Sequence, residues 1–181
     1  MHPYRVAGLI LGALAFLFGG FMVLGFLLPG GWEAEATIEV PAPPSEVFPF
    51  LNGAVGWEAW TPSPESGTEY FGPENGVGSG RRWNDPGYGQ GEFVILDSWR
   101  DRSVSYAVEV EDGAIEIRGR IELDRNTRGT LISWTEAGDF GWNPLLGYLA
   151  NRMSELQSAQ LTASLESLRG LVKAGVRSQN D

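Results

Sequence analysis

The spacing of hydrophobic residues changes twice along this chain. Residues 6–28 form an apolar run without a charged side chain. Between residues 92 and 123 apolar and polar residues alternate, with the period of two that is typical of strands with one buried face. From about residue 144 to residue 173 apolar residues return every three or four positions, which is the period of a helix. The pattern therefore predicts an apolar N-terminal helix, then a sheet, then a long final helix.

The middle of the chain is predicted to form an antiparallel sheet. Asp112-Gly113 is a typical hairpin turn, and clusters of Gly, Pro, Asn and Asp separate the other extended segments. The predicted strands cover residues 36–40, 69–71, 80–83, 92–99, 103–110, 114–123 and 130–137. A short helix at residues 46–52 and a second short helix or turn at residues 53–60 are predicted to follow the first strand.

The apolar run is long enough to cross a membrane. At 1.5 Å per residue, a helix over residues 6–28 spans roughly 34 Å, and a hydrocarbon core is about 30 Å thick. Arg5 precedes the run, and Glu33 and Glu35 follow it. By the positive-inside rule, this charge distribution places the N-terminus in the cytoplasm and the rest of the chain outside the cell membrane.

A cleaved signal peptide is the alternative interpretation of this segment. Ala34-Glu35-Ala36 resembles a small-x-small cleavage site, but the apolar run exceeds the 7 to 15 residues of a signal core, so its length favours a retained anchor. We therefore divide the chain into an anchor (1–31), a folded domain (32–175) and a disordered tail (176–181). Small residues on one stripe of the anchor could support a weak homodimer. They are Gly8, Gly12, Ala15 and Gly19.

Composition removes several classes of function. The chain has no cysteine, its one histidine is His2 and its one lysine is Lys173, so thiol, histidine-dependent and Schiff-base chemistry are not expected in the domain. From residue 29 onward, 12 Lys and Arg stand against 23 Asp and Glu, a balance that repels nucleic-acid phosphates. We expect no metal, no cofactor and no nucleic-acid partner.

The final helix is predicted to leave space opposite the sheet. Its apolar stripe runs through Leu145, Leu149, Met153 and Leu156, and resumes at Leu161, Leu165, Leu168 and Val172. Ala159, Gln160 and Ala163 occupy the buried face where the stripe slips. Facing them, strand parity turns Phe93, Ile95, Tyr106, Val108 and Ile117 inward.

The order of these motifs resembles a known superfamily. The matching segments are IEVPAPPSEVFPFL, WEAWTP, GVGSGRRW, GTLISWTEAG and LESLRGLV. Together they resemble the START-related helix-grip superfamily, the group labelled polyketide cyclase/dehydrase and lipid transport, over about residues 34–173, and its subset with an N-terminal membrane segment. The resemblance implies an α+β helix-grip fold. In it, a curved antiparallel sheet wraps around a long C-terminal helix, two short helices follow the first strand, and a hydrophobic cavity lies between sheet and helix.

The resemblance also implies a role for two tryptophans three positions apart. In family members the segment that holds Trp57 and Trp60 closes one end of the cavity, although both could equally be core residues that brace the short helices. The predicted ligand-binding residues come from this segment, the inward strand positions and the long helix. They are Trp57, Trp60, Phe93, Ile95, Tyr106, Val108, Ile117, Met153, Ala159 and Ala163.

Three charged positions leave alternatives open. GVGSGRRW lacks the Lys-Ser/Thr ending of a phosphate loop, so it is a turn that enters a strand. Arg81 and Arg82 then point to opposite faces; one could reach inward to a ligand, although solvated or ion-paired arginines are commoner. Asp97 is the carboxylate most favoured by parity to face inward, and the competing, favoured interpretation pairs it with Arg100 or Arg102.

Three functions are compatible with these features. The first is membrane-tethered binding of a hydrophobic small molecule or lipid. The second is a cyclase- or dehydratase-like enzyme that uses carboxylate, Tyr and Arg groups in the same cavity, although we assign no catalytic residue. The third is an interaction domain whose cavity has collapsed, and fold alone does not separate the three.

Overall fold

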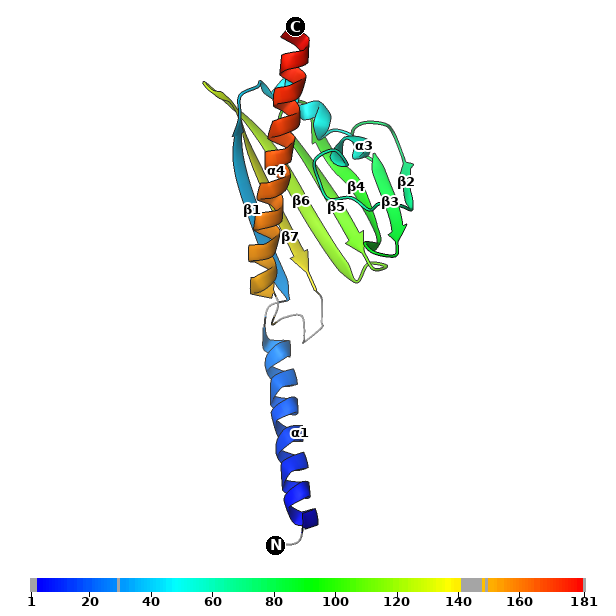
Figure 1. Ribbon diagram of the computed structural model, residues 1–181, viewed down its shortest axis with the longest axis vertical. Coiled ribbons are helices and arrows are strands. Elements are labelled where there is room, and N and C mark those ends of the chain that lie inside the picture. Colours follow the sequence, from blue (N-terminus) through cyan, green and yellow to red (C-terminus); the bar gives the residue numbers. More distant parts are fainter. Residues whose placement is uncertain (1–2, 29, 141–147, 149, 181) are drawn as a thin grey trace.

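The computed structural model describes residues 3–28, 30–140, 148 and 150–180. It has the predicted α+β helix-grip fold (Figure 1). The elements, in chain order, are α1 (Pro3–Leu27), β1 (Gly31–Val40), α2 (Pro44–Val47), the 3-10 helix η1 (Phe48–Phe50), α3 (Ala54–Trp57), β2 (Thr68–Phe71), β3 (Gly80–Asp85), β4 (Gly89–Trp99), β5 (Ser103–Val110), β6 (Ile115–Asn126), β7 (Gly129–Asp139) and α4 (Ala150–Asn180).

The seven strands form one antiparallel sheet in the order β1-β7-β6-β5-β4-β3-β2. From β7 to β2, neighbouring strands are consecutive in the sequence. Strand β1 lies beside β7 instead of β2, because the segment with α2, η1 and α3 carries the chain from β1 to the opposite edge of the sheet. Helix α4 packs along β1 and reaches β7 through the hydrogen bond between Gln157 and Glu136, and the sheet curves around it (Figure 1). The short helix α3 contacts β3 and β4, so two separate segments cover the same face of the sheet.

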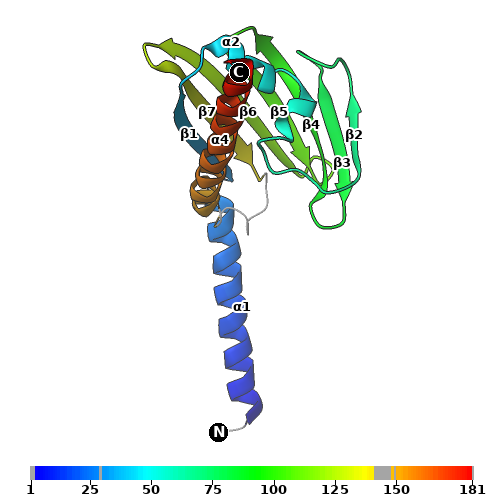
Figure 2. The same ribbon diagram turned by 45° about the horizontal axis from the view of Figure 1, so that its top comes forward.

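Helix α1 projects from one end of the sheet, and the C-terminus lies at the other end (Figures 1 and 2). We call the end nearest α1 the proximal end and the opposite end the distal end. Gly31 pairs with Asp139 at the proximal end, and Asp139 also pairs with Glu116 at the start of β6. The β3–β4 and β5–β6 turns therefore lie at the proximal end as well.

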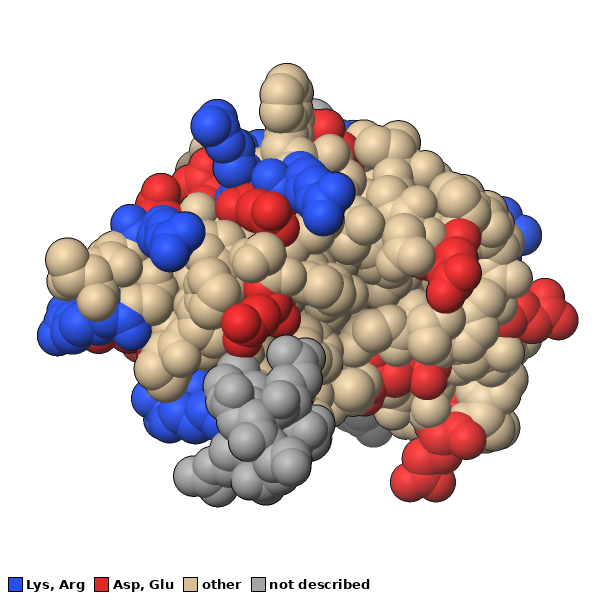
Figure 3. All heavy atoms as spheres, turned by 90° about the horizontal axis from the view of Figure 1, so that it is seen from above, with Lys and Arg blue, Asp and Glu red and all other residues tan. Residues whose placement is uncertain are grey.

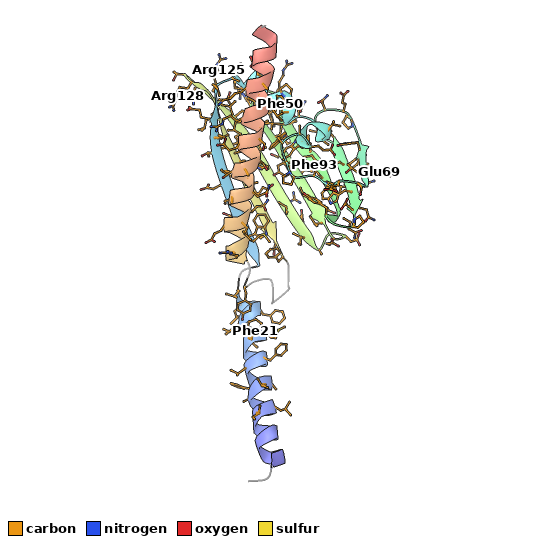
Figure 4. The ribbon with its side chains drawn as sticks, in the orientation of Figure 1. Phe21, Phe50, Glu69, Phe93, Arg125 and Arg128 are labelled. Atoms are coloured by element: carbon orange, nitrogen blue, oxygen red, sulfur yellow. The ribbon has the colours of Figure 1, made fainter. Side chains whose placement is uncertain are left out.

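Within the described residues, Tyr148 of the domain contacts α1. The Tyr148 and Phe21 rings stack with centroids 4.4 Å apart, and the Tyr148 hydroxyl donates a hydrogen bond of 2.6 Å to the Phe21 carbonyl oxygen. Phe21 is labelled on α1 in Figure 4. Most of the large apolar side chains described between Ile10 and Leu28 are exposed. Among the described residues, only the α1 segment Ile10–Leu27 is long and apolar enough to cross a membrane. A signal sequence would pass the same test.

Charge is unevenly distributed on the distal surface. Figure 3 views this end and shows most of the basic side chains on one side and mainly acidic ones on the other. Arg125 and Arg128, beside the β6–β7 turn, lie on the basic side, and Glu69 of β2 lies across the domain (Figure 4). Arg128 forms an ion pair of 3.1 Å with Glu39, so part of this basic charge is neutralised locally.

Two boundaries differ from those predicted. Strand β1 begins at Gly31 rather than at residue 36, because Trp32, Ala34 and Ala36 alternate with exposed residues and continue the buried face. Helix α4 continues to Asn180, so the predicted disordered tail is helical up to that residue; no proline interrupts it. The predicted start of this helix at residues 144–147 and 149 lies outside the described residues.

Candidate functional site

A cavity of about 450 Å³ lies between the sheet, α4 and the segment after α3. Phe93, which lies on the sheet face under α3, is labelled in Figure 4. Most of the cavity wall is apolar or aromatic, with a few polar groups between. Its lining residues are Trp57, Thr61, Pro62, Arg81, Trp83, Tyr88, Phe93, Tyr106, Val108, Val110, Ile117, Trp134, Glu136, Gln157, Gln160, Leu161 and Ser164.

Trp57 is the centre of an aromatic cluster at the inner end of the cavity. Its ring centroid lies 4.8 Å from Phe93, 4.8 Å from Tyr106 and 5.8 Å from Trp134. Tilted and edge-to-face pairs at these distances stabilise more than their buried area alone. Trp60 lies behind Trp57, with centroids 4.7 Å apart, so Trp57 forms the wall and Trp60 supports it.

Both indole groups of this pair are satisfied by backbone carbonyls of the preceding segment. Trp57 Nε1 donates to Leu51 O at 2.9 Å, and Trp60 Nε1 donates to Phe50 O at 3.1 Å. The two tryptophans thus fasten α3 to the end of η1. Trp57 is buried in the core and also lines the cavity, so the two roles considered for it, core packing and closure of the cavity, are combined in one side chain.

A buried carboxyl group lies in the cavity wall. Glu136 of β7 accepts a short hydrogen bond from the Tyr106 hydroxyl on Oε1 and a bond of 2.6 Å from Gln157 Nε2 on Oε2. Trp134 Nε1 donates to the Tyr106 oxygen at 2.7 Å. Burial raises the pKa of Glu136 above its ordinary value, and the two donated hydrogen bonds offset only part of the shift. Burial and then the neighbouring Glu136 raise the pKa of Tyr106 well above 10.

A glycine makes room for this network. Gly119 of β6 is the register partner of Tyr106, and a Cβ at Gly119 would lie 2.1 Å from Tyr106 Cζ. The tyrosine ring therefore lies over bare backbone and reaches Glu136. Gly91 of β4 serves Trp83 in the same way, since a Cβ there would lie 2.4 Å from the Trp83 ring. Glycines inside strands often mark such close approaches.

The opposite wall of the cavity carries a buried arginine. Arg81 Nη1 donates to Ser63 Oγ at 2.9 Å and lies 3.7 Å from Glu58 Oε1. Its guanidinium carbon lies 5.9 Å from the Trp83 ring centroid and 5.8 Å from the Phe93 centroid. Arg82 points to the outer face and pairs with Glu92 at 2.5 Å. The predicted opposite orientation of the two arginines is confirmed, and it is Arg81 that faces inward.

The rim of the cavity is closed on one side by the β3–β4 turn. Tyr88 Oη donates to Pro62 O at 3.2 Å. The turn itself is held by Asp85, which accepts hydrogen bonds from the Ser66 hydroxyl and from the backbone N–H groups of Ser66, Gly87 and Tyr88. These bonds, the Ser66 hydroxyl first, lower the pKa of Asp85.

Residues 31–173 match the model of the family described as polyketide cyclase/dehydrase and lipid transport. The chain belongs to this family. The match covers the whole described sheet and nearly all of α4, so the cavity lies entirely within the family domain. No curated protein sequence matches the chain.

Solved structures share the fold at low sequence identity. Protein CV1439 from Chromobacterium violaceum is 19% identical, with a TM-score of 0.52, over 77% of this chain and 96% of that one. StfQ, a di-domain ARO/CYC from the steffimycin biosynthetic pathway, is 10% identical, with a TM-score of 0.62, over 81% of this chain and 52% of that one. Ara h 8.0201 is 14% identical, with a TM-score of 0.59, over 80% of this chain and 99% of that one. These similarities establish the polyketide cyclase/dehydrase fold and no specific ligand.

The structure brings half of the predicted ligand-binding residues to the cavity of this family member. Trp57, Phe93, Tyr106, Val108 and Ile117 line it. Trp60 and Ile95 are buried in the core, and Met153 is half-buried against it, outside the cavity lining. Whether the lining residues bind a ligand remains a prediction.

Ala159 and Ala163 are a correction. Both are exposed on α4, whereas Gln157, Gln160, Leu161 and Ser164 line the cavity. The prediction placed the small residues of α4 on its inward side, but polar side chains occupy most of the inward positions there. Leu156, which was also placed on the buried stripe, is 56% exposed.

Asp97 also differs from both interpretations offered for it. A register shift between Ile95 and Asp97 interrupts the alternation, so parity does not carry across it. The carboxylate accepts hydrogen bonds from the Ser98 N–H and from Trp99 Nε1, at 2.9 and 2.8 Å. It is therefore a local turn acceptor outside the cavity lining.

Sequence reasoning missed Glu136, the carboxyl group that does face the cavity. The signal was present, since Ile132, Trp134 and Glu136 share one face of β7 and the first two are apolar. Gln157 could have been found in the same way, four positions after Met153. Arg81 was considered, but nothing in the sequence separated it from Arg82.

Other hollows have more polar walls. One of about 790 Å³ reaches Tyr106, Gly119 and Glu136 but also includes exposed charged residues of the outer sheet face, namely Glu33, Glu35, Arg118 and Arg120. Within the described residues, no cluster of His, Asp or Glu could hold a metal ion. The aromatic cavity is thus the best candidate for a small-molecule site.

Proposed function

We propose that this chain is a membrane-tethered protein that binds a hydrophobic small molecule or lipid in the cavity between the sheet and α4. One observation carries the proposal: a volume of about 450 Å³ is lined by Trp57, Phe93, Tyr106, Val108 and other apolar side chains, with few polar groups. Cavities of about 300 to 1,000 Å³ with this composition are typical of small-molecule sites. A collapsed interaction domain would fill this space with side chains.

The tether is supported by α1. If α1 spans a membrane, Phe21 lies about 10 Å from the end of the apolar segment, so its partner Tyr148 reaches from the domain to below the membrane surface. The cavity residues Tyr88, Val110 and Ile117 belong to strand ends and turns at the proximal end. A ligand that leaves the bilayer would meet this end of the domain first.

Two variants of neighbouring residues test cavity binding. Ser164 is buried and lines the cavity, whereas Ala163 is exposed. In the full-length protein in detergent, Ser164→Phe should abolish uptake of the uncharged probe N-phenyl-1-naphthylamine, measured by fluorescence above a micelle blank, while Ala163→Phe should leave uptake unchanged. Mass spectrometry of organic extracts would then identify the natural ligand. Absence of probe uptake by the wild type would refute the proposal.

The tether is tested separately. The protein should stay in the membrane fraction after carbonate extraction, and protease added from outside should digest the domain if the N-terminus is cytoplasmic. Recovery of mature protein that begins at Thr37 would instead establish a cleaved signal, and protection from protease would reverse the orientation.

Glu136 favours a second candidate, a cyclase- or dehydratase-like enzyme. A buried carboxyl group with a raised pKa, in contact with Tyr106 and facing the cavity, could transfer a proton to or from a bound molecule. Extracted ligand, or synthetic compounds related to it, should then be converted by the wild type and not by Glu136→Gln, which should still bind them. No conversion by either protein would leave binding as the function, whereas equal conversion by both would mean that Glu136 is not the group that transfers the proton.

A further inference from the structure

Two buried hydrogen-bond donors in the cavity wall have no partner among the described residues. They are Arg81 Nε and Trp83 Nε1. Both side chains lie on the same face of β3, two positions apart, and both line the cavity. A buried donor without an acceptor is costly, and native proteins retain few of them. Trp32 Nε1 is also unpartnered, but Trp32 lies over Gly138 and is outside the cavity lining.

The surroundings of Arg81 leave its Nε without an acceptor among the described residues. Nη1 reaches Ser63, and Glu58, a partly exposed residue, lies at 3.7 Å, beyond hydrogen-bond distance. Tyr70, the register partner of Arg81 on β2, interacts with both Arg81 and Glu58, but Arg81 Nε has no acceptor among the described residues. The Arg81 side chain is 7% exposed, so bulk water has little access to Nε. The rings of Trp83 and Phe93 hold the guanidinium beside the cavity.

The polar groups at the Tyr106 end of the cavity are, by contrast, already paired. Both carboxyl oxygens of Glu136 accept hydrogen bonds, from Tyr106 and from Gln157. Phe93 separates the two groups, with its ring 5.2 Å from Tyr106 and 5.8 Å from the Arg81 guanidinium. The cavity wall, as far as the structure describes it, therefore lacks a hydrogen-bond acceptor for Arg81 Nε and Trp83 Nε1, and this acceptor would lie beside the positive charge of Arg81.

We infer that the cavity selects an apolar acid, whose hydrocarbon or ring body lies between the sheet and α4 and whose carboxylate accepts hydrogen bonds from Arg81 Nε and Trp83 Nε1. The inference rests on the proposed binding function and adds the chemical class of the ligand. A carboxylate supplies the charge and the acceptor oxygens that the two donors lack, and charge-assisted bonds of this kind are stronger than neutral ones. A neutral lipid alcohol supplies neither the charge nor a second oxygen.

The test compares dodecanoate with dodecanol, which have the same chain length and differ in the head group. Binding of each to full-length protein in maltoside micelles is measured by titration calorimetry, with micelles alone subtracted. We expect the wild type to prefer dodecanoate and Arg81→Gln to lose about ten- to a hundredfold in dodecanoate affinity with dodecanol unchanged. Arg82→Gln, on the outer face of the same strand, is the matched control and should bind both like the wild type.

Trp83→Phe keeps an aromatic ring but removes one donor, so it provides a second variant should Arg81→Gln fail to fold. It should weaken dodecanoate binding several-fold and leave dodecanol binding unchanged. Equal affinity of the wild type for the two compounds, or dodecanoate binding that is insensitive to both variants, would overturn the inference and leave cavity binding intact. If neither compound nor N-phenyl-1-naphthylamine binds, the proposed function itself fails.

Discussion

The distal and proximal halves of the domain use the same helix and the same sheet but are filled differently. In the distal half, Leu165, Leu168 and Val172 of α4 are at most 2% exposed and face a sheet side whose Val40 and Ile132 are fully buried. In the proximal half, the polar residues Gln157, Gln160 and Ser164 accompany Leu161 on α4, and the cavity lies opposite them. The backbone is continuous through both halves, so side-chain choice alone decides where the domain is closed.

The comparison separates stabilising residues from residues that leave space. A leucine stripe in the proximal half would bury more apolar area and stabilise the fold, at roughly 25 cal/mol per Å². Glutamine at these positions forgoes that gain. The proximal half is therefore less well packed than the same architecture allows, and a bound apolar molecule is what would complete it.

The largest expected effect contrasts the two halves directly. Leu165→Ala removes a fully buried side chain from the distal half and should lower the free energy of unfolding by about 2 to 5 kcal/mol. Gln160→Ala, on the cavity rim, should change it by less than about 0.5 kcal/mol. Urea denaturation of the full-length protein in detergent, followed by far-ultraviolet circular dichroism, measures both. A comparable loss for Gln160→Ala would mean that the proximal half is as tightly packed as the distal half.

A smaller effect is expected where the two halves meet. Gly119→Ala places a methyl group within 2.1 Å of Tyr106 Cζ, so the ring must move away from Glu136. We expect a loss of about 1 to 3 kcal/mol from overpacking. Gly170→Ala, on an exposed part of α4 with no heavy atom within 4 Å of the new Cβ, is the control and should be neutral or slightly stabilising. If Gly119→Ala left the free energy of unfolding unchanged, the Tyr106 ring would be able to move away from residue 119 at little cost.

These two halves also differ in how well the sequence predicted them. The distal half follows simple periodicity, since Leu165, Leu168 and Val172 lie on the predicted buried stripe. Strand β5, which runs through both halves, was predicted residue for residue as Ser103–Val110. Strand parity likewise turned Phe93, Tyr106 and Ile117 inward. Apolar periodicity is a reliable guide wherever apolar side chains meet one another.

The proximal half breaks that rule, and there the sequence misled. Inward residues next to a cavity need not be apolar, so Gln157 and Glu136 were overlooked and the exposed Ala159 and Ala163 were chosen in their place. The register shift after Ile95 is a second cause, because a bulge has no reliable signature in one sequence. The missing partners of Arg81 and Trp83 depend on three-dimensional proximity, which periodicity does not contain.

Titration of Glu136 should distinguish the proximal half from the surface. Because burial raises its pKa, the folded protein keeps a proton at pH values where the unfolded chain has lost it. Stability should therefore be complete below the ordinary glutamate pKa of about 4.3 and fall as pH rises through the raised value, by about 1.4 kcal/mol for each pH unit that separates the folded and unfolded pKa values. Glu136→Gln should lack this fall, and Glu33→Gln, at an exposed position, should retain it. Parallel pH profiles of stability for wild type and Glu136→Gln would contradict the assignment.

The smallest expected effect compares two buried tryptophans of the cavity wall. Trp57 Nε1 has an acceptor in Leu51, whereas Trp83 Nε1 has none among the described residues. Replacing Trp57 by Phe removes a hydrogen bond that fastens α3 and should cost about 1 kcal/mol or more. Replacing Trp83 by Phe removes apolar area but also an unsatisfied donor, and the two should offset each other to within about 0.5 kcal/mol.

Denaturant unfolding in the absence of added ligand measures both variants. Since the indole N–H of Trp83 gains an acceptor only when an acid is bound, added dodecanoate should stabilise the wild type more than Trp83→Phe; a large loss for Trp83→Phe without ligand would make this tryptophan, like Trp57, part of the framework of the fold.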